Sequence, residues 1–397
     1  MLDAAEEISA VVVVSSAVSL ERFSGRTLVD RHIEALRRAG VTRVTVGAPA
    51  ILAADVRASL AADDRRVEVA AGESLPAPEG APPRFRVVVC AERVFDTRLY
   101  EAAVAARAPA AMLARGRPIG LDVVSPDPHQ PRADLHVEDM DPYSRELRRA
   151  VPPSWMRVSS IADRAAVRAM LIAASGKGHL EVVAHVLHRP IEAAIMQRLA
   201  ETRLSPNHIT LLCNVVAYAG AALLATGHLA AGTLAAMAVG VIDGLDGRQA
   251  RVQLRTSAFG AVEHVFDKIY EILWIAALTY AVSSGFEIDG YAKGLIWWIA
   301  AYLADTAAYD VFKLCSGIRL DEASPTDAAI RMIAGRRNIY TYMLLAGVIA
   351  RQPAAAYWAI VWWAAVTAIV HWMRVTYLLT RMWPASPRTA CDGPARK

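Results

Sequence analysis

The stretch "VIDGLDGRQARVQLRTSAFGAVEHVFDKIYE", residues 241–271, places acidic side chains between two long apolar segments. Asp243 and Asp246 are three residues apart, and Glu263 and Asp267 are four apart. Both spacings put a pair of carboxylates on one face of a helix. Ionised groups are costly where a helix borders lipid, so their presence indicates a functional site.

A cation is needed if these carboxylates come together. Four converging negative charges repel one another, and carboxylate oxygens are ligands that suit Mg²⁺ or Mn²⁺. Two such ions, about 3.5–4 Å apart, form a clamp used for displacement at phosphorus. Gly247 and Gly260 permit close approach of a ligand to the backbone, and Ala250 keeps the wall small. Arg251 offers a two-pronged donor for phosphate, so the stretch predicts a site for a phosphorylated ligand.

The apolar segments are long enough to predict membrane spans. Apolar residues make up 55% of the 397-residue chain, and from about Ile209 onward long apolar runs take over. We expect six transmembrane helices, near 207–226, 228–243, 258–283, 290–312, 339–350 with its flanks, and 355–380. Arg and Lys concentrate in alternate gaps and in the C-terminal tail. The positive-inside rule therefore predicts a multi-pass protein of the cell (inner) membrane, with the N-terminal domain and the acidic stretch on the cytosolic side.

The first half of the chain has the pattern of a soluble α/β domain. Apolar β-branched runs at 10–16, 41–48 and 85–92 predict strands, and 27–40 has helical spacing. This alternation is typical of a doubly wound sheet. The net charge of +4 and the absence of a dense basic stripe argue against a nucleic-acid partner. The four cysteines form no CxxC pair, which argues against a disulfide framework or a structural zinc site.

These patterns give four expected regions. An α/β domain covers 1–157, a linker with amphipathic interfacial helices covers 158–203, a six-helix membrane domain covers 204–384, and a flexible tail covers 385–397. The amphipathic segment contains Pro190, where a kink or break is expected. Whether this segment lies on the membrane surface or packs on its neighbours stays open at this point.

The acidic stretch resembles the signature of the CDP-alcohol phosphatidyltransferase family. That signature reads D-x-x-D-G-x-x-A-R, eight residues, then G-x-x-x-D-x-x-x-D, and it is matched at Asp243, Asp246, Gly247, Ala250, Arg251 and Gly260. The last two acids of the signature fall on His264 and Lys268. A frame one residue earlier restores an acid pair, Glu263 and Asp267, on one helix face, and we adopt it. The other frame predicts an inactive site.

The resemblance, over about residues 178–380, implies a six-helix homodimeric membrane enzyme. Its substrate is a CDP-linked alcohol, which a second alcohol attacks at the β-phosphorus with release of CMP. By the resemblance, Asp243, Asp246, Glu263 and Asp267 hold Mg²⁺ or Mn²⁺ as two ions, and Asp267 also takes the proton of the attacking hydroxyl. The CDP group is expected at Asn207, in "LSPNHIT" before the first span, and at Gly247, Ala250, Arg251 and Gly260.

Two alternatives remain open from the residues alone. Arg336 and Arg337, at the start of the fifth span, either bind the phosphate of an acceptor or serve as positive-inside anchors. The departure from the signature also permits a catalytically silent membrane scaffold, whose cytosolic domain binds a nucleotide or a partner protein.

Residues 9–150 resemble a sugar-nucleotide nucleotidyltransferase domain. The fusion is similar to the bifunctional inositol-phosphate cytidylyltransferase/di-inositol-phosphate-phosphate synthases. Those enzymes use a glycine-rich loop after the first strand, but "SSAVSLERFSG" has no glycine before Gly25 and no Lys. Ala91 and Glu92 stand where a metal-binding Asp is expected. The resemblance thus implies a domain that has lost cytidylyl transfer and serves in docking or regulation, while the CDP-alcohol is made elsewhere.

Overall fold

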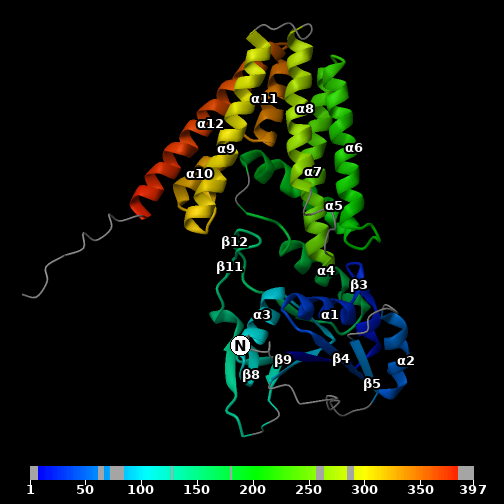
Figure 1. Cartoon of the computed structure of the whole chain (residues 1–397). Coiled ribbons are helices and arrows are strands. Elements are labelled where there is room, and N and C mark those ends of the chain that lie inside the picture. The colour runs from blue at the N-terminus through cyan, green and yellow to red at the C-terminus, as the bar shows by residue number, and fades with distance from the viewer. Residues whose placement is uncertain are drawn as a thin grey trace, which may run out of the picture. The chain divides into compact units, whose positions relative to one another are not determined.

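The structure is a computed structural model that describes residues 8–60, 67–71, 85–125, 127, 129–178, 181–255, 263–283 and 290–382. It divides into two compact units, each assembled from separate segments of the chain (Figure 1). The first unit comprises Met1–Gly178, Glu192–His208 and Leu245–Ser257. The second comprises His179–Ile191, Ile209–Gly244 and Ala258–Lys397.

The first unit is built on a mixed sheet. Within the described residues the sheet has seven strands in the order β10-β8-β9-β6-β1-β4-β5. Their bounds are β1 Ser9–Val13, β4 Arg43–Ala48, β5 Val67–Ala71, β6 Arg86–Cys90, β8 Ala110–Ala114, β9 Arg117–Val124 and β10 Ala133–His136. Strand β1 pairs in parallel with β4 and β6, β4 with β5, and β8 with β10, whereas β9 runs antiparallel to β6 and β8. The predicted α/β domain is confirmed, with parallel pairing everywhere in this sheet except at β9, and its doubly wound arrangement stays a prediction.

Buried β-branched side chains explain the centre of this sheet. Val11 and Val12 of β1 are at most 1% exposed, as expected for a strand covered on both faces. Short pairings extend the unit at β2 Arg22–Phe23, β3 Arg26–Thr27, β7 Arg93–Phe95, β11 Tyr143–Ser144, β12 Arg149–Ala150 and β13 Trp155–Arg157. The helices are α1 Leu28–Arg38, α2 Ala50–Ser59, α3 Thr97–Ala106 and α4 Arg164–Ala173. Thr27 caps α1 by accepting from the Asp30 amide, and Val29, Ile33 and Leu36 join the core.

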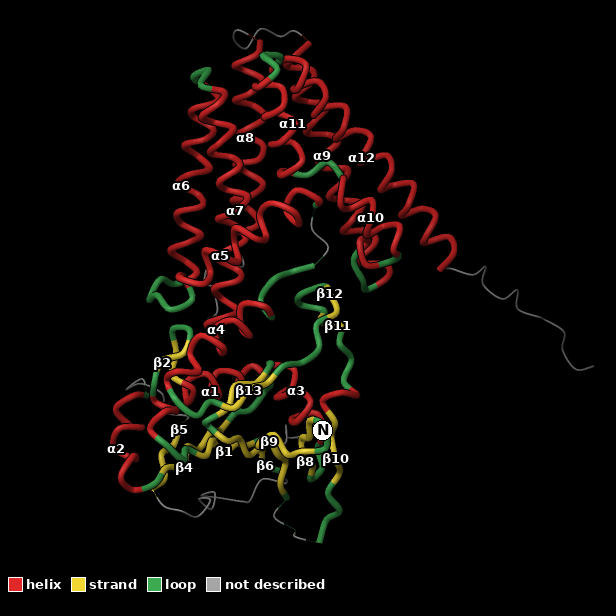
Figure 2. Tube along the Cα trace, turned by 180° about the vertical axis from the view of Figure 1, so that it is seen from behind, coloured by secondary structure: helices red, strands yellow, loops and turns green. Residues whose placement is uncertain are grey.

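The second half of the chain is helical. The π-helical turn η4 Ala184–His188 leads directly into α5 Arg189–Leu199, so the chain stays helical through Pro190. The long helices are α6 Pro206–Ala225, α7 Leu229–Gln253, α8 Glu263–Ser283, α9 Gly290–Ser316, α11 Arg337–Ile349 and α12 Pro353–Met382, with the shorter α10 Pro325–Ile333. Figure 2 shows α6, α7 and α8 running side by side. In the part of the chain that the structure describes, α6, α7 and α12 are long and apolar enough to cross a membrane. The count of six spans stays a prediction.

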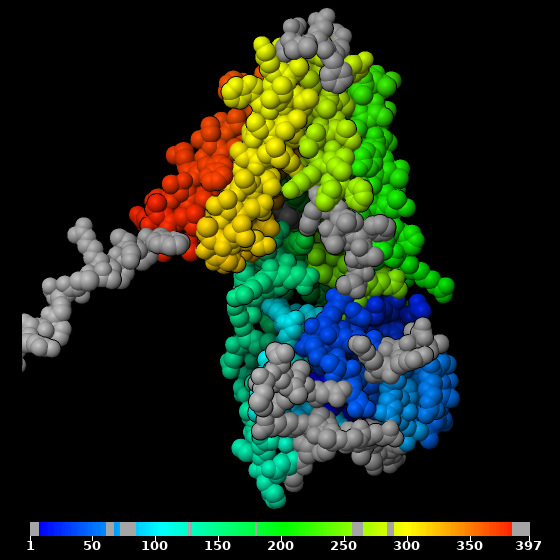
Figure 3. Space-filling view, viewed as in Figure 1, coloured from blue at the N-terminus to red at the C-terminus, as the bar shows by residue number. Residues whose placement is uncertain are grey.

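The core of the second unit is aromatic, and its exterior is apolar. Trp298, Tyr270 and Tyr357 are at most 1% exposed and belong to one cluster of buried side chains. Helices α9 and α12 pack along each other and form an outer face of this unit in Figure 3. Trp297 of α9 and Trp362 of α12 are 69% and 67% exposed. Large apolar side chains on an outer surface are what a lipid environment favours, which agrees with a membrane protein.

Candidate active site

Three carboxylates of the second unit surround one arginine. Arg337 Nη2 lies 2.5 Å from Asp243 Oδ2 on α7. Its other guanidinium nitrogens lie 3.9 Å from Asp267 Oδ1 and 3.8 Å from Glu271 Oε1, both on α8. Arg337 also donates to the Tyr270 hydroxyl, which in turn donates to Asp267 at 2.8 Å. The structure therefore places Asp243 and Asp267, from two separate helices, around a shared counter-charge.

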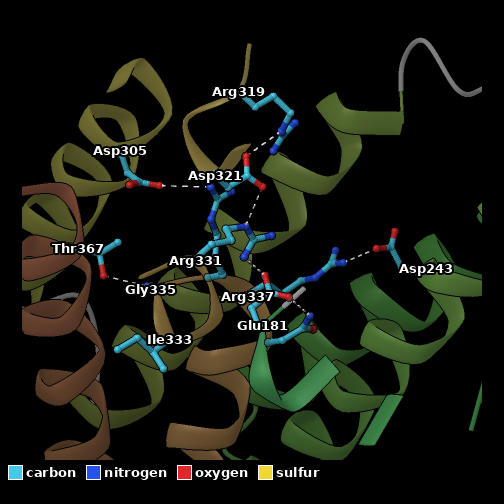
Figure 4. Close-up of polar contacts among 12 residues, drawn as sticks. Glu181, Asp243, Asp305, Arg319, Asp321, Arg331, Ile333, Gly335, Arg337 and Thr367 are labelled. Atoms are coloured by element: carbon cyan, nitrogen blue, oxygen red, sulfur yellow. Dashed lines mark hydrogen bonds and ion pairs between the residues drawn. The ribbon is translucent and has the colours of Figure 1, made fainter. Parts of the chain in front are cut away.

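A glycine positions this arginine. Arg337 is the first residue of α11, and Figure 4 shows its side chain extending toward Asp243. Just before it, the Gly335 amide donates to Thr367 Oγ1 at 2.8 Å. A Cβ at Gly335 would lie 2.5 Å from the Tyr340 hydroxyl and 3.0 Å from Thr367 Oγ1. Only glycine permits this close approach, which fixes where α11 begins.

The carboxylates suit a divalent cation in chemistry and in charge. All three offer oxygen ligands, which Mg²⁺ and Mn²⁺ prefer. Three carboxylates and one guanidinium leave a formal charge of −2 if every group is ionised, so the group can accept more positive charge. Within the described residues, no three His, Cys, Asp or Glu side chains stand close enough together to form a metal site. Cation binding by these side chains therefore needs them to close around the ion, with Arg337 withdrawn from Asp243.

A polar cavity of about 400 Å³ adjoins this group. Its walls include Asp267, Glu271, Arg336 and Arg337. Lys268 lines it as well, so the next residue of α8 contributes a positive charge to the same space. The volume falls within the roughly 300–1,000 Å³ of pockets that hold small molecules. The cavity thus brings the predicted base, Asp267, and a predicted phosphate-binding residue, Arg336, to one space.

Arg336 is held by a cluster of side chains from α9 and α12. Its Nη2 lies 3.9 Å from Asp305 Oδ2, and its guanidinium carbon lies 4.7 Å from the centre of the Tyr309 ring. His371 hydrogen-bonds to the other oxygen of Asp305. The buried Nε of Arg336 has no hydrogen-bond partner among the described residues. Arg336 lines the cavity, and its role in binding an acceptor phosphate stays a prediction.

The remaining residues of the signature lie near the end of α7. Asp246 is 5% exposed, and one of its oxygens accepts from the Gly247 amide at 2.5 Å. Arg251 donates from Nε to the Ser175 carbonyl at 2.7 Å. Its guanidinium folds back over Gly247, where a Cβ would lie 3.4 Å from its nitrogens. Arg251 is thus engaged by the protein.

The structure does not test the predicted roles of several site residues. Ala250 lies in the same part of α7, and Asn207 lies in the first turn of α6; both are partly buried. Gly260 and the side chains of Glu263 and His264 lie outside the described residues. Their proposed roles stay predictions.

Glu271 is the site residue that sequence reasoning missed. It lies one helical turn after Asp267, and its side chain is 18% exposed. Tyr302 of α9 hydrogen-bonds to it. The four-residue spacing between Asp267 and Glu271 does indicate that both carboxylates lie on one helix face. The family signature ends at Lys268, however, so the prediction considered only the acids before that residue.

The loop after β1 shows why the first unit departs from nucleotidyltransferases. The backbone amides of Ser15 and Ser16 both donate to Glu92 Oε1 at 2.7 Å. Adjacent amides in such a loop are the donors with which phosphate-binding loops hold their ligands. Here a carboxylate of the chain itself accepts from them. This geometry agrees with the predicted loss of cytidylyl transfer.

Residues 203–370 match the family model described as CDP-alcohol phosphatidyltransferase. Residues 203–370 are thus similar to the CDP-alcohol phosphatidyltransferase family. This match confirms the resemblance drawn from the acidic stretch, and the matched range includes Asp243, Asp267 and Arg337.

Curated relatives confirm the resemblance to bifunctional enzymes. The chain is 24% identical over 193 residues to the "Bifunctional IPC transferase and DIPP synthase" of Aquifex aeolicus, covering 48% of this chain and 43% of that protein. The protein of the same name from Rubrobacter xylanophilus is 33% identical over 125 residues, covering 31% of this chain and 29% of the relative. These matches therefore span less than half the length of each relative.

Two solved structures of one enzyme are also similar. They are the phosphatidylinositol phosphate synthase of Mycobacterium tuberculosis in its apo form and with CDP-DAG bound. Sequence identities are 20% and 21%, and TM-scores are 0.36 and 0.35. The matches cover 48% and 53% of this chain and 95% and 99% of the solved chains.

Proposed function

We propose that the chain is a metal-dependent CDP-alcohol phosphotransferase of the inner membrane, with its active site on the cytosolic side. It moves a phosphatidyl or phospho-alcohol group from a CDP-alcohol to a second alcohol, of the inositol type or a phosphorylated polyol, and releases CMP. The observation that carries this proposal is the meeting of Asp243 and Asp267 around Arg337, beside a cavity that also contains Arg336. A homodimer is part of the proposal.

The reaction exchanges a phosphoanhydride bond for a phosphate ester bond. The acceptor hydroxyl oxygen bonds to the β-phosphorus of the CDP-alcohol, and the bond from that phosphorus to the oxygen of CMP breaks. Asp267 takes the proton from the hydroxyl, since its carboxylate lies in the cavity wall. Arg336, with an unused Nε donor, holds the phosphate of an acceptor in the same cavity.

A divalent cation would be held by the carboxylates of α7 and α8. The residues that we assign to it are Asp243, Asp246, Glu263 and Asp267, with Glu271 added from the geometry. When bound, such an ion supplies positive charge to the diphosphate as negative charge develops on it. Arg337 offsets part of the negative charge of Asp243 and its neighbours when the carboxylates are not binding an ion.

The test is CMP release by the purified full chain. The chain in detergent is incubated with Mg²⁺ or Mn²⁺, CDP-diacylglycerol or CDP-inositol, and candidate alcohols. Asp267→Asn should lower the rate by about 100-fold or more, the range expected for loss of a general base. Asp55→Asn, the same change on the exposed side of α2, should keep the rate. An Asp267→Asn variant with the full rate would refute the assignment of the base.

The same assay tests the alternative that the chain is a catalytically silent membrane scaffold. The ion pair between Arg337 and Asp243 favours that alternative, because a structural ion pair neutralises a buried acid without any catalysis. No CMP release with any tested pair of substrates, from a folded protein, would favour the scaffold. In either case we propose that the α/β domain serves in docking or regulation, which the contact of Glu92 with the loop after β1 supports.

A further inference from the structure

The first unit contains a cavity of about 460 Å³ whose walls carry five arginines. They are Arg31 and Arg38 of α1, Arg98 of α3, Arg145 between β11 and β12, and Arg251 of α7. The volume lies in the range of pockets that take small molecules. Among the described residues, neither the loop after β1 nor Asp243 lines this cavity. The cavity therefore shares Arg251 with the signature stretch, but its lining includes neither the carboxylate group nor the degenerate nucleotide loop.

Arg31 is the least satisfied of these arginines. It is 2% exposed, and its Nη2 donates to the Val252 carbonyl at 2.5 Å. Its Nε is buried and has no hydrogen-bond partner among the described residues. Burial lowers the pKa of Arg31 to about 10, so the guanidinium is still charged at neutral pH. A buried charge with an unused donor is costly, and an anionic ligand close to the guanidinium offsets part of that cost.

The acids of the cavity do not cancel its positive charge. Asp96 is already used, because it accepts from the Arg98 amide and pairs with the Arg98 guanidinium at 2.9 Å. Glu146 lies 3.9 Å from an Arg251 nitrogen, but its side chain is 66% exposed. Burial, with the nearby Asp96 and Glu146, raises the pKa of Glu101. Once the Asp96–Arg98 pair is set aside, four arginines face two carboxylates of the cavity. One of the four, Arg38, also pairs with Glu34 at 3.1 Å, outside the cavity lining, so among the described residues three arginines have no acid partner other than these two carboxylates.

We infer that this cavity binds a small phosphorylated molecule whose phosphate is held by Arg31, Arg38 and Arg145. Planar guanidinium groups match phosphate oxygens in a two-pronged geometry, and several arginines on one cavity are typical of such binding. Phe95 and Tyr143 line the same space and supply an aromatic surface for the organic part of the ligand. The shared chemistry is the phosphate group, which nucleotides and polyol phosphates both carry.

Calorimetric titration of the full chain in detergent tests this inference. EDTA is present throughout, so that metal-dependent binding at the carboxylate group does not contribute. Pyrophosphate, CMP and glycerol 3-phosphate are titrated separately. We expect saturable binding of at least one of them; tighter binding of CMP identifies a nucleotide site, and tighter binding of glycerol 3-phosphate identifies a polyol-phosphate site. No saturable binding of any of the three would overturn the inference.

Variants locate the binding. Replacing Arg38 and Arg145 together by Ala should weaken binding about tenfold or more, as expected for lost charge-assisted hydrogen bonds. Arg117→Ala, an exposed change on β9, should leave the affinity unchanged. Arg31→Met removes the buried charge at similar length and should abolish binding, whereas Asp243→Asn should keep it. Affinity that persists in the Arg38/Arg145 double variant would overturn the inference, even if Arg31→Met fails to fold.

Discussion

Arg337 Nη2 lies 2.5 Å from Asp243 Oδ2, joining the start of α11 to the middle of α7 across 94 residues of sequence. The Arg337 side chain is 11% exposed and the Asp243 side chain is 27% exposed, so the guanidinium is largely withdrawn from water and the carboxylate is partly so. This contact explains how acids that would repel one another persist on adjacent helices. In the absence of a bound cation, the guanidinium of Arg337 therefore supplies positive charge to these carboxylates.

Removing that charge should make the protein depend on added cations. Arg337→Gln leaves Asp243, Asp267 and Glu271 without their common partner, and loss of one side of a buried ion pair costs about 3–5 kcal/mol. We expect a lower melting temperature without metal and a larger rise on adding Mg²⁺ than in the unmodified protein. Lys293→Gln, on the exposed side of α9, is the matched control. An equal response to Mg²⁺ in both proteins would contradict this account.

The importance of Glu271 can be compared directly with that of Glu263. If the geometry around Arg337 identifies the working carboxylates, Glu271→Gln should lower CMP release at least tenfold. Glu263→Gln tests the frame taken from the sequence, and both variants make the same change in charge on α8. The ratio of the two rates is the measurement. If Glu271→Gln kept the full rate of CMP release, Glu263 and not Glu271 would be assigned as the metal ligand.

A methyl group at Gly335 should disturb both arginines. The Cβ of Gly335→Ala would come within 2.5 Å of the Tyr340 hydroxyl, and overpacking of this kind costs about 1–3 kcal/mol. Since Gly335 precedes Arg336 and Arg337, we expect lower thermal stability together with slower CMP release. Gly290→Ala is the control, because a Cβ there would meet Trp358 at an ordinary 3.7 Å. Unchanged stability and rate in Gly335→Ala would show that α11 tolerates the shift.

The α/β domain should lose stability in mild acid through His32. This side chain is fully buried, with Nδ1 2.7 Å from the Tyr100 hydroxyl and Nε2 3.1 Å from the Ala91 carbonyl. The two partners suit the neutral ring, with Nε2 donating and Nδ1 accepting. Burial, with the nearby Arg31, lowers the pKa of His32 to about 4.

The direction of this change in stability follows from the pKa of histidine in the unfolded chain. An unfolded histidine has a pKa of about 6.5, so the unfolded state gains its proton first as the pH falls. Stability is therefore lost between about pH 6.5 and pH 4, by about 3 kcal/mol at most. Hydrogen exchange in β1 and β6, corrected for intrinsic rates, measures this loss. His32→Gln should reduce the dependence of stability on pH. An unchanged pH dependence in that variant would show that other groups cause it.

Glu92 should be a structural residue of the first unit. Glu92→Ala leaves two amides of the loop, one exposed and one partly buried, without their acceptor, and the loss of each such hydrogen bond costs about 0.5–1.5 kcal/mol. Faster exchange at Ser15 and Ser16 would report this loss. The unmodified protein should release no pyrophosphate from CTP with any phosphorylated polyol. Steady release of pyrophosphate would show that the domain is an active nucleotidyltransferase.

Local sequence patterns were sufficient to predict strands such as β1 and to predict that Asp243 and Asp267 belong to one site. The β-branched run at Val11–Val14 predicts a central strand, since burial on both faces selects such residues. The spacing of acids predicts that Asp267 faces Asp243, and the shared arginine agrees with that. In each case the information lies within a few residues of chain.

Contacts between distant residues could not be predicted in the same way. The sequence marks Arg337 as a phosphate ligand or an anchor, because nothing near it indicates Asp243 as its partner. Glu271 was missed because its role depends on that arginine. Likewise, Glu92 was recognised as a replaced ligand, but its two hydrogen bonds with the loop depend on the register between β1 and β6.

The hydrogen bonds of Glu92 have a consequence for any attempt to restore nucleotide chemistry to the first unit. Introducing glycines and a lysine into residues 15–25 would rebuild the shape of a triphosphate loop while its amides still held an internal anion. A triphosphate would have to displace a tethered competitor at very high effective concentration. Reactivation would therefore have to begin by shortening or neutralising position 92, and only then would changes in the loop improve affinity.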